Sequence, residues 1–148
     1  MAHFAELESK TDPTGFTSDT HLVVKRVVVV ATDEVPSDEH VDGETWCVNF
    51  FGGGTWKQTS YNANFRKQYA GIGMVYNASK NKFLLQQPYA SWSLDGSDDW
   101  QAPVTYPNGD QSAYIISWDE DNLRWVGVKI SDNSNHRWDA DNTEWVSL

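Results

Sequence analysis

Apolar and polar residues alternate along the first part of the chain in a way that predicts two strands. Residues 4–8 alternate with the period of a half-buried strand. Residues 22–31 form a β-branched run that Lys25 and Arg26 interrupt, which predicts a second strand with one partly solvated stretch. Because residues 11–15 hold the Pro and Gly of a turn, the two strands could pair as an antiparallel hairpin with a long connection.

The apolar spacing then changes to that of a helix, and it predicts one short helix at about residues 43–51. Asp42 is placed to be its N-cap, and four apolar residues within the segment fall at helical spacing. The three glycines at 52–54 end the helix. The acidic, proline-containing stretch at 33–42 predicts a surface loop before it.

The middle of the chain returns to strand-like patterns. Residues 55–76 mix aromatic, amide and basic side chains without helical period, which predicts a strand, a loop and a strand. A turn at 77–81 and a further strand at 82–85 follow. The predicted fold class is therefore α+β, with mostly antiparallel β-structure, one short helix and Trp-rich β-hairpins at the C-terminus.

An internal repeat of tryptophans occupies the last third of the chain. Three Trp pairs flank short polar runs: Trp92 and Trp100, Trp118 and Trp125, and Trp138 and Trp145. The Asp, Asn and Gly residues between them are typical of hairpin turns, so each pair predicts a β-hairpin with Trp on both strands. Cross-strand aromatic pairs stabilise a hairpin by roughly 0.2–1 kcal/mol. We expect the last pair to be poorly covered by its own chain.

Length and charge set the domain organisation. The 148 residues match one β-rich domain, with a main body at 1–91 and a Trp-hairpin repeat region at 92–148. The net charge of −10 is unevenly distributed. Residues 1–50 carry ten acidic and three basic residues, residues 51–91 carry five basic and no acidic ones, and residues 92–148 carry eleven acidic and three basic ones.

The basic middle of the chain has two interpretations. Lys57, Arg66 and Lys67 alternate with aromatic residues, a mixture that grips phosphates and stacks bases. The acidic total opposes this, so we expect no nucleic-acid partner. The same bases could instead pair with the acidic flanks of this chain or of a neighbour. The candidate protein-interface residues are Lys57, Arg66, Lys67, Tyr69, Trp118, Trp125, Trp138 and Trp145.

The sequence offers little for catalysis or for metal binding. The four histidines lack metal-ligand spacing, and Cys47 is expected to be a small buried apolar group. The polar runs at 119–122 and 139–142 resemble half of a calcium loop, but hairpin turns prefer the same residues. We therefore expect no catalytic residue, no metal site and no cofactor. No apolar run is long enough to span a membrane.

Several motifs resemble a family of small, mostly uncharacterised virion-associated proteins of marine tailed bacteriophages, such as cyanophages. The motifs cover most of the chain, and they lie at residues 3–7, 51–62, 66–73, 88–95 and 100–107 and in the closing Trp hairpins. Two features depart from the family: the turn at 10–20 is longer than usual, and the Trp hairpin recurs once more at the C-terminus. The resemblance implies a virion component and supplies no functional residues.

The resemblance and the interface chemistry together predict a non-enzymatic structural protein of a phage virion. The expected role is a capsid decoration or cement protein that binds the major capsid protein, localised in the virion and assembled in the cytoplasm of the bacterial host. A homo-oligomer is possible, and no membrane partner is expected. In this hypothesis Trp138 and Trp145 bury against a neighbour. The alternative is a tail, fibre or baseplate-associated protein that contacts carbohydrate through its Trp hairpins.

Overall fold

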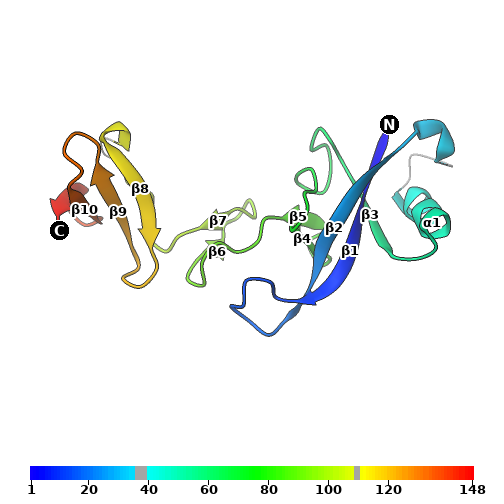
Figure 1. Ribbon diagram of the computed structural model, residues 1–148, viewed down its shortest axis with the longest axis horizontal. Helices are drawn as coiled ribbons and strands as arrows, with labels where there is room; N and C mark the ends of the chain where they lie inside the picture. The colour runs from blue at the N-terminus through cyan, green and yellow to red at the C-terminus, as the bar shows by residue number, and fades with distance from the viewer. Residues whose placement is uncertain (36–39, 109–110) are drawn as a thin grey trace. The chain divides into compact units, whose positions relative to one another are not determined.

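The computed structural model describes residues 1–35, 40–108 and 111–148 and divides the chain into two compact units (Figure 1). Unit 1 comprises Met1–Gln86, and unit 2 comprises Gln87–Leu148. The sequence analysis placed the division between the main body and the repeat region a few residues later, after residue 91. Most of the described structure is antiparallel β-sheet with one α-helix, which confirms the predicted α+β class.

Unit 1 is built on a five-stranded antiparallel sheet with the order β3-β1-β2-β4-β5. Its strands are β1 (Ala2–Thr11), β2 (Thr20–Val30), β3 (Thr55–Thr59), β4 (Val75–Asn77) and β5 (Lys82–Leu84). The predicted hairpin of the first two strands is confirmed, and both strands are longer than the sequence pattern indicated. The β-branched run of β2 provides the central strand of this sheet.

A β-bulge explains the basic interruption in β2. Glu6 pairs with Arg26 while Leu7 pairs with Val24, so Lys25 is the extra residue. The bulge leaves both basic side chains exposed and lets the apolar residues on either side face the interior. The interruption in the hydrophobic pattern thus marks a change of register and not the end of a strand.

Core residues cover both faces of this sheet. On one face, Phe83 packs in a cluster with Leu7 and Tyr76. On the other, Phe4 and Trp56 pack against the helix α1 (His40–Phe51). The helix approaches closely at Gly43, where an added Cβ would lie 2.4 Å from the ring of Phe4. Glycine is therefore required there by packing.

The helix begins earlier than predicted. It includes His40, so Asp42 lies within the first turn and the N-cap assignment is wrong. An acidic residue in the first turn still interacts favourably with the helix dipole, which is why the sequence signal was misread. Of the predicted loop at 33–42, residues 32–34 form a short 3₁₀-helix, η1 (Thr32–Glu34), and 36–39 lie outside the described residues. The helix ends at the glycines, as predicted.

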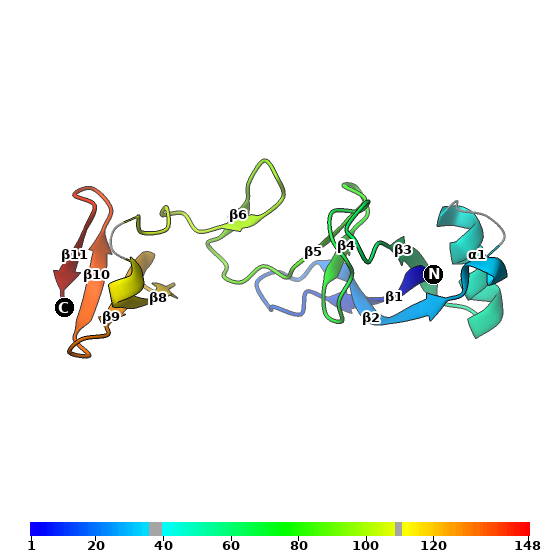
Figure 2. The same ribbon diagram turned by 90° about the horizontal axis from the view of Figure 1, so that it is seen from above.

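Unit 2 contains a four-stranded antiparallel sheet with the order β11-β10-β9-β8 (Figure 2). Its strands are β8 (Tyr114–Asp119), β9 (Arg124–Lys129), β10 (Asn135–Asp139) and β11 (Glu144–Ser147). A short 3₁₀-helix, η2 (Gln111–Ala113), precedes β8. A separate two-stranded hairpin joins β6 (Ser93–Leu94) to β7 (Trp100–Gln101).

The last two Trp hairpins form as predicted. Trp118 is directly opposite Trp125, and Trp138 is opposite Trp145. Each turn begins with an Asp whose carboxylate accepts hydrogen bonds from the Asn three residues later. Each turn also ends on a residue with positive φ, 51° in the first and 52° in the second. The two hairpins are therefore copies of one design, a four-residue turn closed by an Asp–Asn contact.

A third copy of this hairpin lies in unit 1, at the turn and strand predicted for residues 77–85. Tyr76 is opposite Phe83, with the same spacing as the Trp pairs. Asn77 takes the place of the Asp and accepts a hydrogen bond from the Lys80 amide, and Asn81 has the positive φ. The repeat is thus defined by its turn and by an aromatic pair, of which Trp–Trp is one version.

The predicted pair of Trp92 and Trp100 is wrong. Trp100 is opposite Leu94 instead, because five residues connect β6 to β7 whereas four connect the strands of the other hairpins. Trp92 leaves the hairpin and packs edge-on against Trp118 and Trp125, with ring centroids 6.1 and 5.9 Å away. It therefore belongs to the aromatic core of unit 2.

Candidate functional site

The structure places the basic candidates of unit 1 beside an acidic residue of the same unit. Glu44 of α1 contacts Lys57 at 3.4 Å and the guanidinium of Arg66 at 3.0 Å. Arg66 also donates to the backbone oxygen of Gln58 at 2.8 Å and to Asn81 Oδ1 at 2.9 Å. Its side chain is only 7% exposed. This is the pairing with the acidic flank of the same chain that the sequence analysis weighed as an alternative.

Arg66 acts as a clamp within unit 1. Its contacts join the helix, the edge strand β3 and the β4–β5 turn. Its backbone has φ of 54°, and its carbonyl oxygen accepts a hydrogen bond from the amide of Phe83. A buried and paired guanidinium has little to offer a partner protein, because exposing it would break its bonds to Glu44, Gln58 and Asn81.

The other two candidates of the basic segment lie close to the clamp. Lys67 is partly buried and has φ of 72°. Tyr69 packs edge-on against His3 and Tyr61, with ring centroids 5.5 and 5.4 Å away. The structure thus brings Lys57 and Arg66 together on Glu44, while Tyr69 belongs to a separate aromatic group.

The Trp candidates form the buried face of the sheet in unit 2. Trp118, Trp125 and Trp138 are buried in one cluster. Trp145 is half-buried and stacks on Tyr114, with ring centroids 4.5 Å apart and an angle of 21° between the rings. The expectation that the last Trp pair is poorly covered by its own chain is therefore wrong.

Gly127 makes room for the ring of Trp145 on the sheet. A Cβ added at Gly127 would lie 2.9 Å from the ring of Trp145, so glycine lets that ring lie flat on β9. The strand opposite, β10, presents His136 at this point. The Trp rings of unit 2 therefore form a self-packed aromatic core.

The opposite face of the same sheet is open, and the sequence analysis missed it. Its side chains, which we call the open face, are Ile115, Ser117, Asp119, Arg124, Val126, Val128, Asn135, Arg137, Asp139, Glu144 and Val146. Ile115 is 66% exposed and lies opposite the half-buried Val128. The signal was present in the sequence, because apolar residues alternate with the ring residues along β8 and β9.

Charged residues form part of the open face. Arg124 and Asp119 form an ion pair with 3.1 Å between Nε and Oδ2, and Arg137 lies between Val126 and Val146. A hollow of about 410 Å³ lies here, lined mainly by residues of this face. The open face therefore mixes aliphatic and charged side chains, and in a protein-binding patch of this kind apolar burial supplies affinity while charges set specificity.

The groups with catalytic or metal-binding potential have structural roles. Cys47 is fully buried, and its burial, followed by the charge of Glu44, raises the pKa of the thiol to about 11. Hydrogen bonds from Asn122 and Asn142 hold the pKa values of Asp119 and Asp139 below their usual range. These carboxylates therefore serve the hairpin turns. Among the described residues, no three His, Cys, Asp or Glu side chains lie together as metal ligands would.

Comparison of the chain with protein-family models, with curated proteins and with solved structures finds no match. Within the described ranges, no helix has both the length and the hydropathy that a membrane span requires. The geometry of the two units is therefore the basis for a functional proposal.

Proposed function

We propose that the chain is a non-enzymatic structural protein of a phage virion, a decoration protein that docks on the major capsid protein through the open face of unit 2. The observation that carries the docking surface is the open face itself. The capsid partner rests on the resemblance of the sequence motifs to virion-associated proteins of marine tailed phages.

Apolar burial would supply the affinity. Burying an aliphatic side chain that is otherwise exposed contributes about 1.5 kcal/mol or more. Ile115 is mostly exposed, and Val128 and Val146 are partly exposed, so a flat partner surface would gain most from Ile115 and less from the two valines. A capsid lattice presents many identical sites, so moderate affinity at each site is enough to coat the particle.

Charge would orient the docking. Residues 92–148 carry eleven acidic and three basic residues, so a basic surface on the partner is the complementary one. Exposed charges are screened by salt, and we therefore expect occupancy of the particle to fall as salt rises. The basic segment of unit 1 and the Trp pairs are not contact residues in this proposal, because both are engaged within their own units.

Quantitative mass spectrometry of purified virions tests this function. The expected result is a copy number that follows the number of capsid subunits. A copy number that follows the tail symmetry would favour the tail, fibre or baseplate alternative. If the chain is missing from purified virions, both roles are wrong.

A pair of matched variants tests the docking surface. Ile115→Glu places a charge on the open face, and Ile72→Glu places the same charge at a similarly exposed isoleucine of unit 1. We expect the first variant to lose particle occupancy and the second to keep it. Equal occupancy of both variants would contradict docking through the open face.

A further inference from the structure

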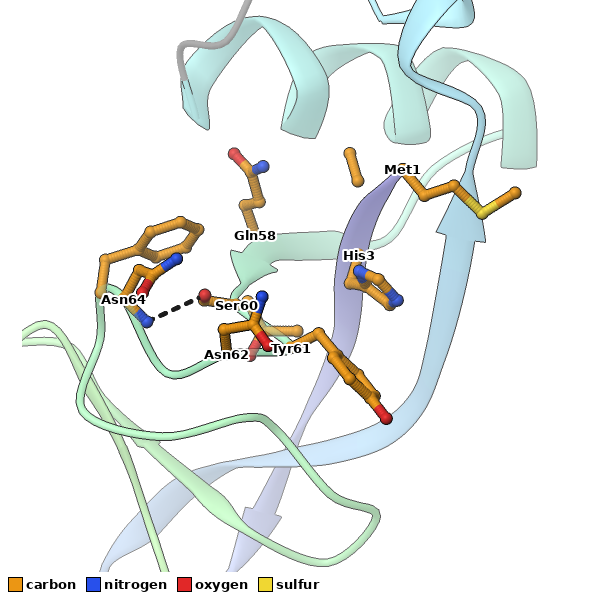
Figure 3. A pocket seen from close by; sticks show the side chains of 10 residues that line it. Met1, His3, Gln58, Ser60, Tyr61, Asn62 and Asn64 are labelled. Carbon is orange, nitrogen blue, oxygen red and sulfur yellow. Dashed lines mark hydrogen bonds between the residues drawn. The ribbon is translucent and has the colours of Figure 1, made fainter.

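A cavity with mixed apolar and polar lining lies at one edge of the sheet in unit 1, beside the end of β3 (Figure 3). Its volume is about 370 Å³, which is sufficient for one or two sugar rings. The cavity is lined by residues of β1, β3 and the segment after it: Met1, Ala2, His3, Gln58, Thr59, Ser60, Tyr61, Asn62, Asn64 and Phe65. We call it the Tyr61 cavity.

An aromatic ring stands at the cavity with one face free. Tyr61 is 70% exposed although it stacks on His3, with ring centroids 5.7 Å apart and an angle of 24° between the rings. Figure 3 shows the two rings side by side. Tyr69 supports both rings edge-on. The outer face of the Tyr61 ring is therefore a supported platform that this unit leaves uncovered.

The turn that carries Tyr61 is held in place by its own hydrogen bonds. Ser60 accepts the Asn64 amide on its hydroxyl at 2.9 Å and the Ala63 amide on its carbonyl at 3.0 Å. Thr59, which is buried, accepts the amide of Ala70 at 2.8 Å and anchors the start of the turn. A ligand would meet a pre-organised surface, which reduces the entropy lost on binding.

Neutral hydrogen-bonding groups surround the platform. The side-chain amides of Asn62 and Asn64 line the cavity, and among the described residues neither makes a hydrogen bond to another protein group. The side-chain oxygen of Gln58 is hydrogen-bonded to His40 Nδ1 at 2.7 Å, so the NH₂ group of Gln58 is not used in this contact. Amides offer both donors and acceptors, as the hydroxyl groups of a sugar require.

We infer that the Tyr61 cavity binds a neutral carbohydrate, with one pyranose ring stacked on Tyr61 and its hydroxyl groups bonded to Asn62 and Asn64. The C–H face of a pyranose is apolar and covers an aromatic ring, while its equatorial hydroxyl groups reach the surrounding amides. A stacking ring with a few placed polar groups is the general composition of a small-molecule site. The site does not depend on the proposed docking through unit 2.

The same platform could stack a nucleobase, but the charges oppose it. Single-stranded nucleic acids are held through their phosphates by Lys and Arg. None of the described residues that line the cavity is Lys or Arg, and the nearby Lys57 and Arg66 are paired with Glu44. The observations therefore favour an uncharged ligand.

NMR titration of the isotope-labelled full chain tests the site. The probes are maltohexaose, cellohexaose, laminarihexaose, mannohexaose and the oligonucleotide (dT)₁₀, each added to millimolar concentration. The expected result is saturable shifts of the amides of residues 58–65 with at least one neutral oligosaccharide. If none of the oligosaccharides shifts these amides, or if (dT)₁₀ alone does, the proposal is wrong.

Variants identify the platform. Tyr61→Ala is expected to weaken binding at least about tenfold, whereas Tyr61→Phe keeps the ring and should bind within a few-fold of the natural chain. Phe16→Ala removes an exposed aromatic of unit 1 outside the cavity and should leave binding unchanged. Tyr61→Ala that binds like the natural chain, or Tyr61→Phe that binds as weakly as Tyr61→Ala, would overturn the stacking role. Amide spectra that change only near the substituted residue and the rings it contacts show that each variant is folded.

Discussion

Units 1 and 2 share a hairpin design but enclose their sheets differently. In unit 1 the hairpin of Tyr76 and Phe83 joins a sheet that has core residues on both faces. In unit 2 two Trp hairpins form a sheet whose rings cover one face and leave Ile115 exposed on the other. The difference indicates that unit 1 covers both faces of its sheet with its own core, whereas unit 2 retains a face that a partner can cover.

The aromatic pair does a different job in each unit. Phe83 is fully buried and packs against residues from β1 and β2, so its hairpin is an added edge of a larger sheet. In unit 2 the Trp rings pack mainly on one another, with centroid separations of 5.0 and 5.2 Å within the two pairs. Unit 2 is thus stabilised by its repeated hairpins. Four predictions test how the packing of unit 1 differs from that of unit 2.

The largest expected effect is the loss of an aromatic ring from either core. Phe83→Ala should destabilise unit 1 by about 3–5 kcal/mol, because it removes a large side chain from a packed interior. Trp125→Ala should have an effect of similar size on unit 2. Indole NH signals measure each unit separately during denaturation, since Trp46 and Trp56 belong to unit 1 and the other six tryptophans to unit 2. If either variant unfolds both units together, the two cores are not separate.

The ion pair of the clamp is expected to have the next largest effect. Glu44→Ala leaves the buried guanidinium of Arg66 without its carboxylate, which should cost about 3 kcal/mol of unfolding free energy in unit 1. Glu8→Ala removes an exposed carboxylate that pairs with Lys10, and it should cost less than about 1 kcal/mol. Urea denaturation of both variants measures the difference. Equal effects would mean that the clamp contributes no more than a surface pair.

Substituting the positive-φ residue of a hairpin turn by Gly is expected to change the stability of the two units in opposite directions, by about 1 kcal/mol or less. Thr143→Gly should stabilise unit 2 by about 0.5 kcal/mol, because a β-branched residue is strained at positive φ. Asn81→Gly should destabilise unit 1 by about 1 kcal/mol, because Asn81 accepts hydrogen bonds from Arg66 and Tyr76. Thermal denaturation of the two variants checks the opposite signs. Stabilisation by both substitutions would show that Asn81 has no additional role, and destabilisation by both would contradict the strain at Thr143.

The smallest expected effect concerns the β1–β2 turn at low pH. Hydrogen bonds from Thr14 and Thr17 lower the pKa of Asp12 to about 2. Because this folded-state pKa lies below the ordinary value of 3.8, the stabilising contribution is present above that value and is lost as pH falls toward 2. Thermal midpoints of unit 1 measured between pH 5 and pH 2 should fall less steeply in Asp12→Asn than in the natural chain. Identical slopes would contradict the role of the Asp12 carboxylate.

Local patterns predicted much of this fold. The alternation in β1 and β2, the helix before the three glycines and the two last Trp hairpins are contained in short windows of sequence. The helix start was misplaced because Asp42 suits the first turn as well as the N-cap. The turn at 77–81 and the strand after it were predicted, but the likeness of this hairpin to the Trp hairpins was not recognised, because its aromatic pair is Tyr76 and Phe83.

The candidate sites were harder to predict because they depend on contacts between distant residues. The pairing of Glu44 with Arg66 spans twenty-two positions, and nothing local distinguishes a buried guanidinium from an exposed one. The Trp rings attracted attention as interface residues, yet the strand period that buries them exposes Ile115 and its neighbours. In a sheet that is covered on one side, the residues that alternate with the buried rings form the accessible surface.

A cryo-electron-microscopy map of the assembled virion tests the central claim most directly. We expect unit 2 to be bound in many copies on the capsid surface. Ile115 and Val128 should be buried against the major capsid protein, and the Trp rings should be enclosed within the unit. A map in which the open face is exposed to solvent while the chain is held through another surface would contradict it.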